Sequence, residues 1–75
     1  MNEALAIALE LEKITEGAVW FQRDGKHMNI WIKGPMMHQL KDNAWQELIK
    51  FKPSSPVMDK LSGQYLFKVK NVFMS

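Results

Sequence analysis

Two histidines are the side chains best suited to acid–base chemistry in this chain, and neither has the neighbours that catalysis needs. His27 follows Asp24 by three residues, and an imidazole beside a carboxylate can act as an acid–base pair. Both residues are expected at a hairpin tip, where water is hard to exclude. The two histidines, His27 and His38, make a weak metal site, because the chain has no cysteine and no carboxylate cluster.

Nucleophilic chemistry and phosphate binding also lack a motif. The four glycines do not have the spacing of a phosphate-binding loop. None of the serines lies in a nucleophile elbow; they are Ser54, Ser55, Ser62 and Ser75. We therefore expect no enzymatic activity, no catalytic residues, no cofactor and no metal, and look for binding instead.

The stretch VWFQRDGKHMNIWIKG, residues 19–34, predicts a β-hairpin. Asp24 and Gly25 are expected to form a type I′ turn, since this dipeptide tolerates positive φ at both central positions. That turn pairs Trp20 with Asn29 and places Trp31 diagonally to Trp20. Because side chains alternate, one face is core (Val19, Phe21, Met28, Ile30, Ile32) and the second face holds Trp20, Gln22, His27, Asn29, Trp31 and Lys33. A one-residue slip would exchange the faces.

The second face and the hairpin tip are the predicted binding surface, comprising Trp20, Arg23, Lys26, His27, Asn29, Trp31 and Lys33. Trp and Arg dominate the hot spots of protein interfaces, so the leading hypothesis is a protein-interaction module that inhibits or regulates a larger protein. The alternative is a single-stranded nucleic-acid binder in which the tryptophans stack on bases while Lys33, Lys68 and Lys70 contact phosphates. A third interpretation buries the tryptophans beneath a helix.

Helical periodicity marks residues 2–15, ending near Gly17. Its apolar stripe is Ala4, Ile7, Leu11 and Ile14, whereas Leu5 and Leu9 point elsewhere. So wide an apolar arc predicts two neighbours: the hairpin, and either another element of this chain or another protein. A structural or self-assembling, virion-type role, with Leu5 and Leu9 buried against a second copy, is a further alternative.

The C-terminal half predicts a helix, a short helix and a strand. Pro35 can open a helix that runs to Phe51 and is interrupted near Asp42-Asn43, where Asn43 with Gln46 resembles a capping box. Ser55-Pro56 is expected to start a short helix through Leu61. The final strand alternates Tyr65, Phe67 and Val69 with Leu66, Lys68 and Lys70. The fold class is therefore α+β, in the order α-β-β-α-(short α)-β, with a three-stranded, mainly antiparallel sheet and helices packed on it.

Composition places the chain among small folded proteins. Its 75 residues, 47% of them hydrophobic, predict one domain spanning residues 1–75. The absence of cysteine and of a long apolar segment favours the cytoplasm and no contact with a membrane. The net charge of +2 divides unevenly: residues 1–16 hold four glutamates and one lysine, and residues 17–75 hold nine basic and four acidic side chains. Such polarity can orient a partner.

The segment ELEKITEGAVWFQRDGKHMNIWIKG, followed by a second helix, resembles the helix–hairpin–helix of small phage head-completion proteins. The resemblance covers about half the chain, and the predicted third strand departs from it, so no functional residue is carried over. The small size and lack of cysteine likewise suit accessory proteins of phages and mobile elements.

Overall fold

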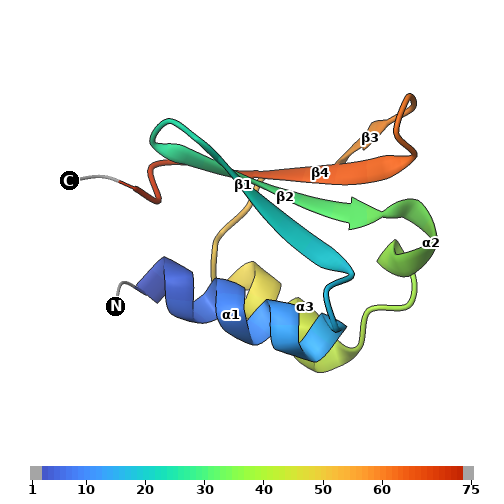
Figure 1. Cartoon of the computed structure of the whole chain (residues 1–75), viewed down its shortest axis with the longest axis horizontal. Helices are drawn as coiled ribbons and strands as arrows, with labels where there is room; N and C mark the ends of the chain where they lie inside the picture. Colours follow the sequence, from blue (N-terminus) through green and yellow to red (C-terminus); the bar gives the residue numbers. More distant parts are fainter. Residues whose placement is uncertain (1–2, 74–75) are drawn as a thin grey trace.

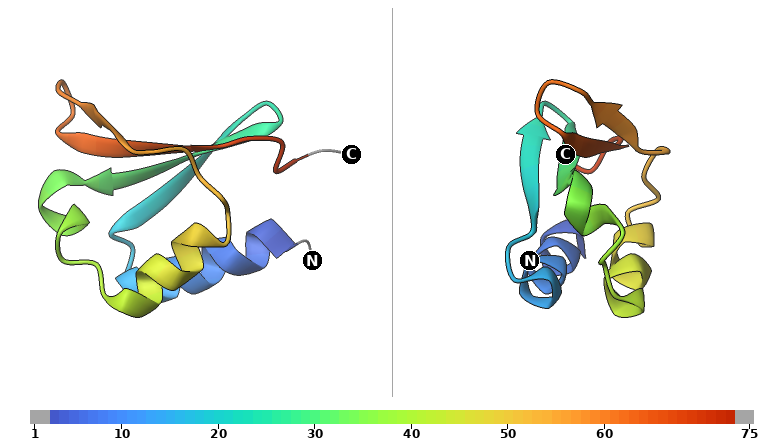
Figure 2. Two further views of the ribbon diagram at one scale, coloured as in Figure 1. Left: turned by 180° about the vertical axis from the view of Figure 1, so that it is seen from behind. Right: turned by 90° about the vertical axis from the view of Figure 1, so that its right-hand side faces the viewer.

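The computed structural model describes residues 3–73, which form three helices and four strands. In chain order these are α1 (Glu3–Thr15), β1 (Val19–Asp24), β2 (His27–Lys33), α2 (Gly34–Met37), α3 (Asp42–Ile49), β3 (Val57–Asp59) and β4 (Gln64–Val69). The strands form one antiparallel sheet in the order β1-β2-β4-β3. Helices α1 and α3 lie side by side beneath one face of that sheet (Figures 1 and 2). The predicted α+β class is confirmed, but the sheet has four strands instead of three.

The β1–β2 hairpin keeps the predicted faces although its register differs from the prediction. Trp20 pairs with Trp31 instead of Asn29, and Asp24 pairs with His27, so Gly25 and Lys26 form the turn. Gly25 has a φ of 61° and Lys26 has no positive φ, the pattern of a type II′ turn with glycine first. The pairing has moved by two residues, and an even shift leaves every side chain on its original face.

The predicted short helix from Ser55 to Leu61 is wrong, because this segment forms strand β3 and a tight loop. Met58 pairs with Tyr65 and Asp59 with Gln64. The Asp59 carboxylate accepts hydrogen bonds from the Leu61 N–H at 3.0 Å and the Ser62 hydroxyl at 3.0 Å. These bonds hold the chain in a turn, which is how aspartate competes with helix formation.

Helix α1 ends in a Schellman motif one residue before the predicted stop. The Gly17 N–H donates to the Glu12 carbonyl and the Glu16 N–H to the Lys13 carbonyl. Glu16, not Gly17, occupies the first left-handed position, with a φ of 53°. The predicted first residue, Asn2, lies outside the described residues.

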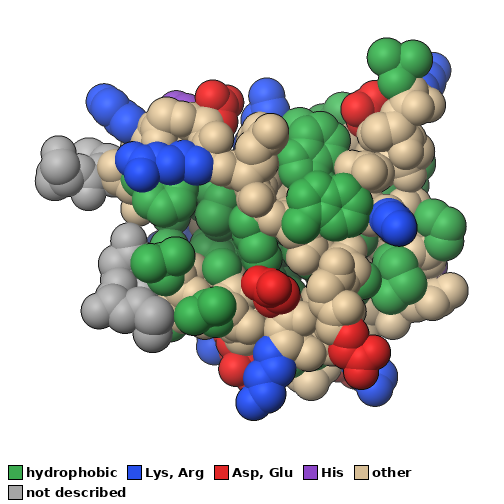
Figure 3. Space-filling model, viewed as in Figure 1, with side chains coloured by type: hydrophobic (Ala, Val, Ile, Leu, Met, Phe, Trp, Pro, Cys, Tyr) green, Lys and Arg blue, Asp and Glu red, His purple; other side chains and the backbone are tan. Residues whose placement is uncertain are grey.

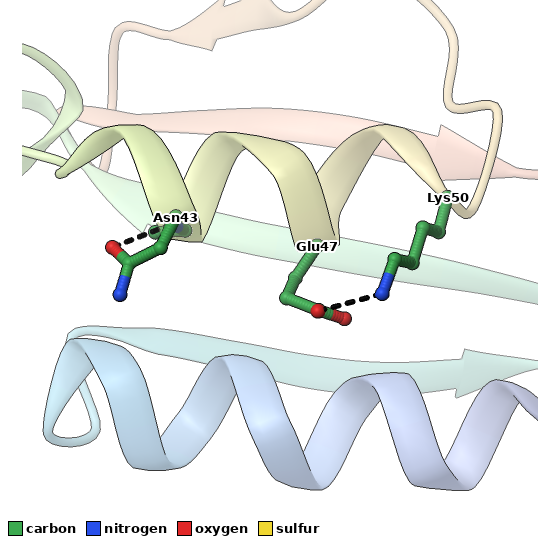
Figure 4. Close-up of polar contacts among 4 residues, drawn as sticks. Asn43, Glu47 and Lys50 are labelled. Atoms are coloured by element: carbon green, nitrogen blue, oxygen red, sulfur yellow. Dashed lines mark hydrogen bonds and ion pairs between the residues drawn. The ribbon is translucent and has the colours of Figure 1, made fainter.

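The segment after β2 is helical in two pieces. Met36 and Met37 belong to the single turn α2, residues 38–41 are not helical, and α3 starts at Asp42 after the N-cap residue Lys41. A polar stripe of Asn43, Glu47 and Lys50 projects from one side of α3 (Figure 4). In it Lys50 donates to Glu47 at 2.7 Å, an exposed pair that contributes at most about 1 kcal/mol. Over residues 3–73, no helix combines the length and apolarity needed to cross a bilayer.

One hydrophobic core lies between the helices and the inner face of the sheet. Its most deeply buried large side chains are Leu11, Val19, Ile30, Ile32 and Leu48. Around them lie Ile7, Met28, Ala44, Phe51, Phe67 and Val69. Of the predicted core face, only Phe21 is not fully buried; its ring packs against Phe51 with centroids 6.3 Å apart.

The left-handed residue at the end of α1 gives a test of the helix terminus. Replacing Glu16 with Gly should make the protein about 1 kcal/mol more stable than Glu16→Ala, because only glycine adopts positive φ without steric cost. Chemical denaturation of both variants measures the difference. Both lose the same carboxylate, so equal stabilities would contradict the left-handed cap.

Candidate binding surface

The outer face of the sheet, opposite the helices, carries an apolar row that crosses all four strands. Trp20 on β1 lies opposite Trp31 on β2, Trp31 lies opposite Leu66 on β4, and Leu66 lies opposite Val57 on β3. We call these four residues the apolar row. The row exists because residues that pair directly across an antiparallel ladder point to the same face.

Polar residues flank the apolar row on both sides. One flanking row consists of Gln22, Asn29 and Lys68, and the other of Lys33, Gln64 and Asp59. The Gln22 side-chain oxygen accepts two hydrogen bonds, from the Asn29 amide at 3.2 Å and the Trp31 indole N–H at 3.3 Å. Gln22 therefore fixes the orientation of the Trp31 ring above the sheet.

No helix of residues 3–73 covers the outer face. Both α1 and α3 lie on the opposite side of the sheet, and α2 lies at the end of β2 (Figures 1 and 2). Trp20, Trp31 and Leu66 are half-buried by their neighbours, and Val57 is 64% exposed. Within the described chain, the interpretation that a helix buries the two tryptophans is therefore wrong.

The charges on the outer face balance. By strand register the face holds Lys33 and Lys68 against Asp24 and Asp59. His27 lies opposite Asp24 at the hairpin end. A surface of two lysines and two aspartates lacks the concentration of positive charge that phosphate binding uses.

Two predicted site residues, Arg23 and Lys26, do not lie with the tryptophans. Arg23 alternates with Gln22 and shares the inner-face parity of Phe21, and its guanidinium stacks 4.4 Å from the centre of the Phe73 ring. Lys26 belongs to the turn, and its carbonyl accepts a hydrogen bond from the Phe73 N–H. Both residues therefore hold the C-terminal segment.

His27 shares that structural role. Its Nδ1 accepts the Asn71 N–H at 3.1 Å, which leaves the ring at the end of the outer face, away from the apolar row. Of the predicted site, Trp20, Asn29, Trp31 and Lys33 remain together, within the apolar row or directly beside it.

Of the two predicted basic strand residues, Lys68 lies at the margin of the outer face and Lys70 follows the end of β4. The Lys68 N–H donates to the Ser54 hydroxyl at 3.1 Å, and the Lys68 carbonyl accepts from the Ser54 N–H at 2.9 Å. The segment between α3 and β3, which contains Ser54, therefore covers this edge of β4. Lys68 and Lys70 line a shallow depression with Lys52 and Phe51. The depression is separated from the apolar row by Lys68 itself.

The polar and charged side chains of residues 3–73 all lie outside the buried core. In residues 3–73 no group of three histidine or acidic side chains could hold a metal ion, and the buried side chains there are all apolar. Leu66 and Val57 belong to the apolar row of the candidate surface, and the sequence prediction missed both. Alternation indicated an outward Leu66, but only the strand order places it beside Trp31.

No protein-family model, curated protein or solved structure matches this chain.

The hydrogen bond between Gln22 and Trp31 predicts a local change that NMR can detect. In a Gln22→Met variant, which keeps the side-chain length but removes the acceptor, the Trp31 indole N–H signal should shift upfield. The loss of stability should stay near or below about 1 kcal/mol, because the bond is exposed. The indole signals of Trp20 and Trp45 are internal controls, and an unmoved Trp31 signal would contradict the contact.

Proposed function

We propose that this protein is a non-enzymatic interaction module that binds a larger protein through the outer face of its sheet. The observation that supports this most strongly is the apolar row of Trp20, Trp31, Leu66 and Val57, bordered by polar rows. Protein-binding patches combine an aromatic and aliphatic centre with a polar rim, and Trp is enriched among their hot spots.

The dimensions of the face suit a partner of ordinary interface size. The Cα atoms of the whole molecule extend over 35 × 25 × 18 Å, and the strands run along its longest dimension in Figure 1. A standard interface buries roughly 800 Å² on each partner, so binding would use most of this face. Binding across this face would let the domain act by covering its partner's surface, as an inhibitor or regulator does. Accessory proteins of phages and mobile elements act in this way, and we propose such a role here.

Single-stranded nucleic acid is the weaker candidate for the same face. It is favoured by Lys68, which lines the shallow depression together with Lys52 and Lys70. The balanced charge of the face itself argues against it, since bases stacked on Trp31 would need phosphate contacts close to the apolar row.

The outer face can be tested with a pair of matched surface variants. Val57→Asp places a charge at the end of the apolar row, and Ile49→Asp places the same charge on α3 at a similarly exposed position, 56% against 64%. Affinity capture from the source cell, quantified by mass spectrometry, should show a partner that Val57→Asp and Trp31→Ala lose and Ile49→Asp retains. Removing a Trp hot spot should weaken binding by 2 kcal/mol or more, about thirtyfold. If all three variants retain the partner, the outer face is not its binding site.

An oligonucleotide titration distinguishes the two candidates. If the ligand is nucleic acid, a labelled single strand should bind, and affinity should fall steeply between low and physiological salt. If the Trp31→Ala variant loses that binding, the ligand of the outer face is nucleic acid and the proposal of a protein partner is wrong. Absence of binding at low salt supports the proposal.

A further inference from the structure

The two edges of the sheet differ in how they are protected. The β3 edge is three residues long, follows Pro53 and Pro56, and is succeeded by Lys60, all features that discourage pairing with another strand. The β1 edge is six residues long, contains neither proline nor lysine, and pairs without interruption to β2 alone among the described strands. Its other side therefore offers backbone N–H and C=O groups for one more strand.

An apolar groove runs beside the β1 edge, between β1 and α1. It has a volume of about 400 Å³, and its apolar walls include Leu5, Leu9, Val19, Trp20 and Phe21. Leu5 is 49% and Leu9 is 56% exposed. Strand β1 and helix α1 form the same side of the molecule, shown at the left of the right-hand view in Figure 2 and facing the reader in Figure 3, where hydrophobic side chains spread across it.

The charges at the two ends of this side are opposite. At the end of α1, Glu12 and Glu16 outnumber Lys13, and all three lie near Gly17, before β1 begins. At the other end of β1, Arg23 and Lys26 outnumber Asp24 in the hairpin tip. In Figure 3 basic side chains lie at the tip beside an acidic one, and the acidic side chains along the helix are accompanied by basic ones.

We infer that the β1 edge and the α1–β1 groove bind a second copy of this chain. Antiparallel pairing of β1 with β1 about a two-fold axis perpendicular to the sheet makes one eight-stranded sheet and places the two α1 helices side by side on the same face. Leu5 and Leu9 of each copy then meet across the axis. The same rotation brings the basic hairpin tip of each copy to the acidic end of α1 in the other.

The opposite charges at the two ends of the β1 edge favour a second copy of this chain as the binding partner, instead of an unrelated strand. A two-fold interface must be self-complementary, since each patch meets its counterpart on the same surface. An edge with opposite charge at its two ends meets this requirement when it pairs antiparallel with itself. The outer face stays uncovered except at its margin, where Trp20 belongs to both surfaces, so a dimer leaves the rest of the apolar row open to a partner.

Sedimentation velocity of the full chain over a concentration series tests the dimer. The wild type should sediment as a reversible dimer. In a two-fold dimer the Leu9→Asp substitution places one charge from each copy in the same interface. It should therefore raise the dissociation constant of the dimer by at least about tenfold. Ile49→Asp is the matched control on α3, outside the interface, and should leave association unchanged. A wild type that stays monomeric throughout would overturn the inference.

A charge exchange tests the antiparallel arrangement itself. Glu12→Lys with Glu16→Lys makes both ends basic, and Arg23→Glu with Lys26→Glu makes both ends acidic. Each double variant alone should associate more weakly than the wild type, whereas an equimolar mixture should form a heterodimer with both end contacts restored. Circular dichroism checks that each variant is folded. A mixture that associates no better than its components would overturn the antiparallel β1 pairing, and Trp31→Ala, which tests the outer face, should leave dimerisation intact.

Discussion

The alternation of side chains along β2 is the constraint on which the rest of this structure depends. This strand pairs with β1 on one side and β4 on the other, so its two faces become the two faces of the sheet. Met28, Ile30 and Ile32 are at most 3% exposed and join the helices, which forces Asn29 and Trp31 outward. Burying the apolar surface of those three side chains stabilises the folded protein by several kcal/mol. A one-residue slip would expose them and lose that stabilisation.

This parity explains why the sequence predicted the faces correctly and the register wrongly. Hydrophobic alternation reports only whether a position is odd or even, and a two-residue shift preserves it. The register depends on which dipeptide forms the turn. Asp24-Gly25 and Gly25-Lys26 both offer a glycine, and the structure places the glycine first. Turn chemistry alone could not decide between them.

The missed strand β3 has a different cause. Three residues are too few for a periodic pattern, and Ser55-Pro56 before them is a helix-start signal. What prevents the helix is a tertiary neighbour: β4 supplies an edge that pairs with Val57–Asp59, and Asp59 closes the turn. Local propensity yields to this long-range pairing, as it commonly does for short strands.

The candidate surface was predictable to the extent that one hairpin contains it. Trp20 and Trp31 follow from alternation, but the neighbours that make them a continuous surface come from β4 and β3, whose order no local pattern reveals. Arg23 was assigned to the site as part of the basic hairpin tip, because arginine is frequent in interface hot spots. Its inner-face parity and its stacking on Phe73 instead make it a support for the hairpin tip.

The two proposed surfaces meet at Trp20, and this has a structural consequence. Trp20 begins the apolar row on the outer face and also lines the α1–β1 groove at the edge. In the proposed dimer the two β1 strands are neighbours, so both apolar rows lie on one side of a single sheet and converge toward its centre. A small domain has little surface with which to form a stable interface, and a dimer doubles it without adding residues. Two identical sites held together would favour a partner that is itself two-fold symmetric or repeated, because its second contact forms at high effective concentration.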